Sequence, residues 1–359
     1  MTKRDRLDGL LADRDLESVW FARPNSFAWL TGGNNVVDRE GDVGVAAVGY
    51  DGDTLRVVTD SIEAGRLREE ELPDDVPVEE YPWYESSLGE AVAEHATTPA
   101  AADFDVPGFE SVDASPLREP LTDEDADDYR ELGAETAAAV EAICRELESD
   151  DTEREIASAV RGALSARGIE TPVALVGGSE RAQKYRHYTP TEAKLGDYAH
   201  VSVTAERDGL HASCTRTVAF DAPDWLAERH RAAAIVETTA LAATQQIAAF
   251  DGRAKDVFEA IRATYEHVGY EGEWKHHHQG GAAGYAGREW IATPTTDDEI
   301  RLPMAYAWNP TVQGAKSEDT VLIGENEMEI LTETGNWPTE SVMAFDYEGA
   351  LPRPAVLEL

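Results

Sequence analysis

Residues 198–220 read YAHVSVTAERDGLHASCTRTVAF, and this stretch decides the fold class of the second half of the chain. It contains two apolar runs, 198–204 and 211–220, with polar residues and Gly209 between them. Runs of this length, rich in Val and Thr and bounded by turn residues, predict strands. Further strands are expected at 173–176, 304–310 and 320–323.

Helices are predicted on both sides of these two strands. Thr122 with Asp125 and Thr152 with Glu155 form capping boxes, and each box precedes apolar residues that recur at helical spacing. Two further helices are expected at 225–250 and 256–268. The resulting order is helix, helix, strands, helix, helix, strands. This order hints at an internal duplication, although the sequence itself shows no repeat.

The first third of the chain has a different pattern, in which short helices and short strands alternate. The runs 43–48 and 55–58 flank the turn-rich residues 50–53, which predicts a hairpin. A charged helix is expected at 61–71, and prolines then interrupt the chain up to Pro120. A helix is also expected at 4–11, and strands at 19–22 and 101–104.

The composition is strongly acidic. The 359 residues include 71 Asp and Glu against 31 Lys and Arg, a formal charge of −40, yet 42% of residues are hydrophobic, enough for a packed core. This charge argues against nucleic acid and anionic membranes as partners. Only six of the cations are Lys. Dispersed carboxylates with few lysines are typical of halophiles, where molar salt screens the repulsion, so we expect the protein to work in high salt.

The remaining compositional features favour a cytoplasmic protein. Cys144 and Cys214 are the only cysteines, which indicates reduced thiols rather than a disulfide framework. The first ten residues, MTKRDRLDGL, lack the apolar region of a signal peptide. No run of about 18 apolar residues is present to span a membrane.

Several short motifs occur in an order and spacing that resemble the creatinase, prolidase and aminopeptidase P family. This resemblance implies an α+β fold class, with a pita-bread catalytic domain at 119–359 and a smaller creatinase-type α/β domain at 1–118. Residues 24–32, PNSFAWLTG, resemble a segment of that smaller domain. The resemblance also implies a homodimer. The motifs are Leu117-Arg118, Thr152-Glu153, Gly178-Ser179, His187-Tyr188, Gly196-Asp197, Thr215-Arg216-Thr217, 284–289 and 317–321.

Most of the family's metal ligands are missing from the matching positions. Peptidases of this family hold two divalent metals with two Asp, one His and two Glu. Of the five matching positions only Glu318 is a carboxylate, so we expect no metal and no other cofactor. The adjacent His277 and His278 leave one route to a metal open. The degenerate positions are Ser202, Ser213, Gly281 and Asn309.

The resemblance to creatinase supplies candidate catalytic residues. Creatinase hydrolyses a C–N bond with a histidine as acid and base, and His187 matches that histidine. Glu318 matches one of its carboxylates, whereas Thr215 stands at the other position. We therefore predict His187 and Glu318 as catalytic residues.

Substrate-binding residues are predicted around two further motifs. Residues 285–289, YAGRE, resemble the creatinase pattern Y-x-G-R-E, and the planar cation of Arg288 suits a carboxylate. In the histidine run 276–278, a strand would place His276 and His278 on one face and His277 on the other. The predicted substrate-binding residues are His277, His278, Tyr285 and Arg288.

Three functions remain open at this point. The first is a metal-independent hydrolase or lyase of a small C–N-bonded or zwitterionic substrate. The second is an Xaa-Pro aminopeptidase or dipeptidase with a residual or altered metal site. The third is a non-catalytic, peptide-binding pita-bread module such as those of histone chaperones. In each case the expected partner is a small molecule or a short peptide.

Overall fold

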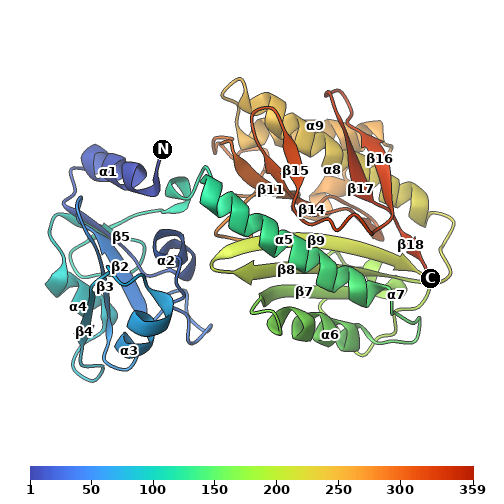
Figure 1. Cartoon of the computed structure of the whole chain (residues 1–359). Coiled ribbons are helices and arrows are strands. Elements are labelled where there is room, and N and C mark those ends of the chain that lie inside the picture. The colour runs from blue at the N-terminus through green and yellow to red at the C-terminus, as the bar shows by residue number, and fades with distance from the viewer. The chain divides into compact units, whose positions relative to one another are not determined.

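A six-stranded mixed sheet in the order β4-β3-β2-β1-β5-β6 forms the centre of residues Met1–Glu119 (Figure 1). The computed structural model describes residues 1–359 and divides them into this unit and a second, Pro120–Leu359. The predicted hairpin is confirmed, because β2 and β3 pair antiparallel across residues 51–54. The strands are β1 (Ser18–Phe21), β2 (Ala46–Tyr50), β3 (Leu55–Asp60), β4 (Val78–Tyr81), β5 (Ala100–Ala102) and β6 (Glu110–Ser111).

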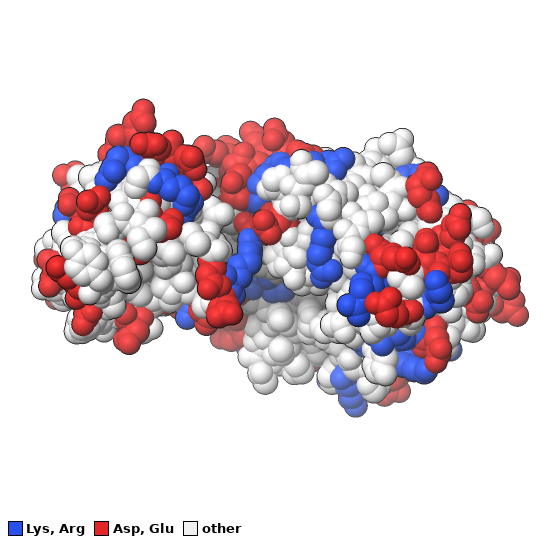
Figure 2. Space-filling view, turned by 90° about the horizontal axis from the view of Figure 1, so that it is seen from below, with Lys and Arg blue, Asp and Glu red and all other residues white.

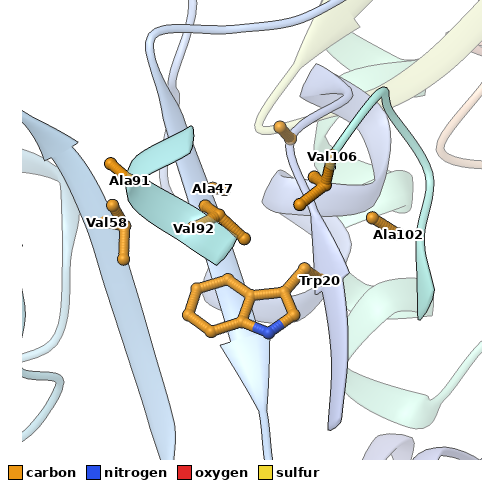
Figure 3. Packing of buried hydrophobic residues seen from close by; sticks show 8 residues of the cluster. Trp20, Ala47, Val58, Ala91, Val92, Ala102 and Val106 are labelled. Atoms are coloured by element: carbon orange, nitrogen blue, oxygen red, sulfur yellow. The ribbon is translucent and has the colours of Figure 1, made fainter. Parts of the chain in front are cut away.

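Short helices flank this sheet. The charged helix predicted at 61–71 begins only at Ala64, because the Asp60 carboxylate accepts the N–H groups of Ile62 and Glu63 and holds a turn there. Figure 3 shows the indole of Trp20 packed among the small apolar side chains of neighbouring strands and a helix. The helices are α1 (Lys3–Arg14), α2 (Pro24–Thr31), α3 (Ala64–Arg66), η1 (Leu67–Glu71), α4 (Leu88–His95) and η2 (Ser115–Leu117).

The second unit repeats one order of elements. Both predicted capping boxes are confirmed: Thr122 caps α5 (Asp123–Cys144) and Thr152 caps α6 (Glu153–Ser165). The strands β7 (Glu170–Gly178), β8 (Tyr198–Arg207) and β9 (Leu210–Ala219) then form an antiparallel sheet, which β18 (Leu357–Glu358) extends. α5 packs against β8 and β9 (Figure 1).

A second pair of helices and a second sheet complete the order that the sequence predicted. The helices are α8 (Leu226–Ala248) and α9 (Ala254–His267), and the sheet has the order β10-β11-β14-β15. None of the helices is long and apolar enough to span a bilayer. The other elements are α7 (Ser179–Ala182), η3 (Glu273–His276), β10 (Gly280–Ala283), β11 (Met304–Trp308), β12 (Thr311–Val312), β13 (Ala315–Lys316), β14 (Asp319–Ile323), β15 (Met328–Ile330), β16 (Thr339–Met343) and β17 (Ala350–Pro354).

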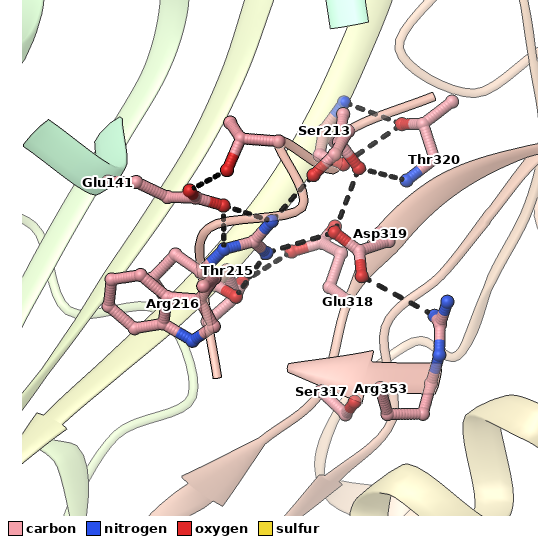
Figure 4. A network of polar contacts seen from close by, with 12 residues as sticks. Glu141, Ser213, Thr215, Arg216, Ser317, Glu318, Asp319, Thr320 and Arg353 are labelled. Atoms are coloured by element: carbon pink, nitrogen blue, oxygen red, sulfur yellow. Dashed lines mark hydrogen bonds and ion pairs between the residues drawn. The ribbon is translucent and has the colours of Figure 1, made fainter. Parts of the chain in front are cut away.

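A buried ionic network joins the two sheets of this unit. Arg216 on β9 is 1% exposed and lies between two carboxylates, Glu141 on α5 and Asp319 on β14 (Figure 4). Its guanidinium bonds Glu141 Oε1 at 3.1 and 3.2 Å and Asp319 Oδ1 at 2.9 Å. Arg353 contacts Asp319 from the other side at 3.5 Å. The network therefore fixes the start of β14, next to Glu318.

The exposed surface carries the acidic excess. In Figure 2 the Asp and Glu side chains are spread over the face in view, with Lys and Arg interspersed, rather than gathered in a single patch. Carboxylates distributed in this way repel one another at low ionic strength, and salt weakens that repulsion.

Acid is expected to destabilise the protein through the buried His200. Its Nδ1 lies 2.9 Å from Thr217 Oγ1, and its Nε2 lies 2.9 Å from the carbonyl oxygen of Gly314, so Nε2 carries a proton and donates it. Burial lowers the pKa of His200 from 6.5 to about 3. Because the unfolded chain binds the proton first, stability falls as the pH drops through this range. A single such group loses roughly 1.5–2 kcal/mol between pH 6.5 and pH 5.

Urea unfolding at several pH values and constant salt measures this loss. His200→Gln should reduce the slope of stability against pH, and the exposed His276→Gln should leave it unchanged. Burial lowers the pKa of His230 to about 4, so His230 still contributes to the slope of stability against pH in both variants. An identical slope in His200→Gln and the wild type would contradict the assignment.

Candidate active site

A cavity of about 500 Å³ in the second unit brings together most of the predicted site residues. Its walls come from β7, β8, the loops before β8 and after β10, and the segment that joins β13 to β14. Six predicted residues line this cavity, namely His187, Ser202, His278, Arg288, Asn309 and Glu318.

The register of β8 and β9 places four hydroxyl groups on one face of the sheet. Ser202 pairs with Thr215, and Thr204 pairs with Ser213, so their side chains share a face. The two hydroxyls of each pair contact each other, at 2.8 Å and 2.9 Å respectively. The backbone N–H of Thr215 donates to the carbonyl of Glu318 at 2.9 Å. This bond brings the carboxylate of Glu318 to the row of hydroxyls.

Two buried cations hold the Glu318 carboxylate. Arg288 Nη2 lies 3.0 Å from Oε1, and Lys316 Nζ lies 2.8 Å from Oε2. All three side chains are at most 11% exposed. Burial raises the pKa of Glu318, but Lys316 and Arg288 outweigh it and hold that pKa at about 2. The carboxylate is therefore ionised at any working pH.

Lys316 lines the cavity but was missed from the sequence. The spacing in the sequence could have indicated it. Residues two apart in an extended segment share a face, so a lysine at position 316 points the same way as Glu318. The resemblance to the family covers residues 317–321 and does not include Lys316.

Three imidazoles meet at the edge of the cavity. His187 Nε2 lies 3.0 Å from His277 Nε2, and the His278 ring stacks on that of His277 with centroids 4.5 Å apart. Burial lowers the pKa of His277 to about 2 and that of His278 to about 4. Burial and then Lys316 also lower the pKa of His187, while Glu318 acts in the opposite direction. All three rings are therefore neutral at pH 7.

The histidine run is not a strand, so the alternation of faces that a strand would give does not apply to it. Gly272 adopts a left-handed conformation with φ of 87°, which starts a 3₁₀ turn over Glu273–His276, and the next strand begins only at Gly280. As a result His277 and His278 both approach His187 instead of pointing to opposite faces. His276 lines a neighbouring cavity of about 780 Å³, which also contains the three clustered imidazoles.

Tyr285 and Gly281 lie apart from the cavity lining. The Tyr285 hydroxyl donates to Asp125 Oδ1 at 2.7 Å, so an aspartate of α5 uses the group that was predicted to bind substrate. Gly281 lies in β10, where the backbone of Trp290 covers it. A Cβ atom at position 281 would lie 2.1 Å from the Trp290 carbonyl oxygen.

The amino-acid sequence of the second unit decides the family. The sequence model of metallopeptidase family M24 matches residues 127–325, which contain the cavity, most of α5, the helices α6, α8 and α9, and the motifs around Glu318. The chain belongs to metallopeptidase family M24. No curated protein matches the chain in sequence.

Several solved structures match nearly the whole chain in fold. Prolidase from Pyrococcus furiosus is 18% identical, with a TM-score of 0.73, over 91% of this chain and 99% of its own. Xaa-Pro dipeptidase from Bacillus anthracis is 14% identical, with a TM-score of 0.74, over 99% of each chain. The N-terminal domain of the FACT complex subunit SPT16 from Cicer arietinum is 12% identical, with a TM-score of 0.63, over 92% and 96%. The predicted pita-bread fold with an N-terminal α/β domain is confirmed.

The residues present do not fit the two-metal centre of M24 peptidases. Ser202 and Ser213 offer neutral hydroxyls that already bond neighbouring hydroxyls. Position 281 has no room for an imidazole, because even a Cβ atom would collide with backbone. Asn309 offers a neutral amide, and both oxygens of Glu318 are paired with cations. A cluster of divalent ions needs several anionic oxygen ligands, which these positions do not supply.

The structure brings together one other group of possible metal ligands. The ligand atoms of His187, His277 and His278 lie within 4.8 Å of one another. Three imidazoles are a known ligand set for a single zinc ion. The positive charges of Lys316 and Arg288 act on this group, and they oppose a bound divalent cation as they oppose protonation of the rings.

Proposed function

We propose that the protein is an M24-family hydrolase or lyase that acts on a small C–N-bonded, zwitterionic substrate without a metal, with His187 as acid and base. The contact between His187 Nε2 and His277 Nε2, at the edge of the cavity that contains Glu318, carries this proposal. A neutral histidine held by a second group is the usual arrangement for proton transfer when no metal activates water.

The two imidazoles give His187 a defined orientation. One ring must donate its Nε2 proton and the other must accept it, because both rings are neutral. When His187 donates, its Nδ1 has a free lone pair and can take a proton from an attacking water or from the substrate. When His187 accepts, its Nδ1 carries a proton that it can give to a leaving nitrogen. The buried His277 therefore acts as a positioning residue.

The pairing of Glu318 with Arg288 and Lys316 favours a positioning role for this carboxylate over direct participation in catalysis. A carboxylate that is held at both oxygens is not available to a substrate cation, because such a cation would have to displace Arg288 or Lys316. We propose that Glu318 instead positions these two side chains in the cavity wall. Thr215 Oγ1, 2.8 Å from Glu318 Oε2, supports the same carboxylate.

The structural likeness to prolidases and Xaa-Pro dipeptidases favours a second candidate, a peptidase that uses a metal at an altered site. That activity would need metal bound outside the degenerate positions, and the three-imidazole group is where the chain offers it. The likeness to the FACT subunit keeps a non-catalytic binding module as the third candidate.

A thermal-shift screen separates these candidates. The chain is treated with chelator and tested in high salt against small amino acids, guanidino compounds and Xaa-Pro dipeptides, with and without Mn²⁺. We expect a small molecule to raise the melting temperature equally with and without Mn²⁺, and chelation to leave the melting temperature of the free protein unchanged. A bound ligand at 100 times its Kd adds about 2.7 kcal/mol, which such a screen detects.

Two results would overturn the proposal. A shift that requires Mn²⁺, or about one tightly bound Mn, Co or Zn per chain by elemental analysis, would favour the peptidase. The absence of any shift with any compound would favour the binding module.

A further inference from the structure

The cavity contains an excess of positive charge in a chain whose formal charge is −40. Arg288 and Lys316 face one carboxylate, that of Glu318, and all three line the same cavity. These three side chains together have a formal charge of +1. Buried cations of low exposure interact strongly with an anion, because little water separates them from it.

The two cations lie among the positions that match the family's metal ligands. Arg288 Nη1 is 3.4 Å from Ser213 Oγ, and its Nη2 is 3.0 Å from Glu318 Oε1. The guanidinium therefore bridges two of the five positions that match metal ligands. Lys316 Nζ contacts the second oxygen of Glu318, which Thr215 Oγ1 also contacts. Positive charge is thus supplied by side chains at the place where M24 peptidases use metal ions.

Several polar atoms around this cavity are buried without a hydrogen-bond partner. They are Arg288 Nε, Asn309 Oδ1, His277 Nδ1 and His278 Nδ1. Lys316 carries three N–H donors on a side chain that is 6% exposed. Buried groups in native proteins are nearly always bonded, so such a concentration at a cavity marks a place where a ligand completes the bonding. Arg288 Nε and the N–H groups of Lys316 are donors and suit an anionic acceptor, whereas Asn309 Oδ1 requires a donor.

We propose that this site has been converted from a metal centre into a carboxylate-binding site, in which Arg288 and Lys316 hold the carboxylate of the substrate. This inference rests on the proposed function and narrows its substrate class to compounds with a free carboxylate. A planar guanidinium beside an ammonium, with one excess positive charge, matches a monoanionic carboxylate. A cavity of about 500 Å³ suits a molecule of amino-acid or dipeptide size.

Titration calorimetry on the chelated full chain tests the proposal with a matched pair of probes. N-acetylglycine carries a carboxylate, and N-acetylglycinamide is its neutral counterpart of the same shape. At one fixed KCl concentration we expect N-acetylglycine to bind about 10-fold more tightly or better. Arg288→Met and Lys316→Met should each lose about 10-fold or more of that affinity. Arg130→Met, which removes an exposed ion pair with Glu329, should leave it unchanged.

Glu318→Gln is expected to change the affinity for N-acetylglycine in the opposite direction. The glutamine amide has the same shape as the carboxylate, so the cavity remains filled. Glu318 competes with the ligand for both cations, so its neutralisation should tighten N-acetylglycine binding several-fold. A cation-binding or metal-binding site predicts weaker binding in this variant. The proposal is overturned if Glu318→Gln weakens binding, if the two probes bind equally, or if binding requires Mn²⁺.

The readout does not depend on turnover. Carboxylate binding that persists while no compound is turned over would refute the proposed function and leave this inference standing. Metal-independent turnover of a compound without a carboxylate would refute this inference alone.

Discussion

Arg216→Met is expected to lower the free energy of unfolding by about 3–5 kcal/mol. The guanidinium is 1% exposed and bonds Glu141 and Asp319, which are themselves about 1% exposed. Methionine fills a similar volume but leaves two carboxylates buried without their shared cation. The loss follows from the cost of an uncompensated buried charge, and it exceeds the net contribution of the intact network.

Urea unfolding followed by circular dichroism measures this loss, with Arg231→Met as the matched control. Arg231 pairs with Glu340 at 3.1 Å, but both side chains are more than half exposed, so its removal should cost less than about 1 kcal/mol. Similar losses in the two variants would show that the buried network adds no more than a surface pair. Asp319 is the sequence neighbour of Glu318. Arg216→Met should therefore weaken carboxylate binding even under conditions in which the variant remains folded.

Local signals in the sequence predicted the frame of the fold well. Capping boxes at Thr122 and Thr152 start the helices that the structure shows, because a hydroxyl and a carboxylate at fixed spacing satisfy backbone N–H groups without help from distant residues. The hairpin of β2 and β3 likewise depends on neighbouring residues. Features of this kind are visible in a single sequence.

The site was predicted only in part, because its geometry depends on contacts between distant segments. Residues 187 and 277 are 90 positions apart, and nothing local to either indicates that their rings meet. Tyr285 was taken for a substrate ligand, whereas its partner is an aspartate 160 residues away. Lys316 was missed because it lies outside the family's motif and its role depends on the charge balance of the folded cavity.

The missing metal ligands and the two cations change the charge of the site in the same direction. A site that loses three carboxylates and keeps Glu318 beside Arg288 and Lys316 changes the sign of its charge. Such a charge favours anions over divalent ions, and under the proposed function proton transfer then comes from a group that works without a metal. Three histidines line the cavity, His187, His211 and His278, and we propose His187 for this transfer because the buried His277 holds it in place.

His187→Asn should therefore lower turnover by about 10²–10⁴-fold for any substrate that the screen identifies. The His187 side chain is exposed, so the melting temperature should stay close to that of the wild type. His277→Asn removes only the positioning contact, so kcat should fall less and KM should change little.

His276→Asn is the control for these variants, since His276 belongs to the same run but is exposed and lies outside the three-imidazole cluster. Its turnover should match that of the wild type. Calorimetry with N-acetylglycine should give the same affinity for His187→Asn and the wild type, because the carboxylate contacts Arg288 and Lys316 rather than the imidazole. Full turnover in His187→Asn would rule out this residue as the acid and base. The cation pair would then have to act on the scissile bond directly, by stabilising developing negative charge, and Lys316→Met would be the variant that loses kcat.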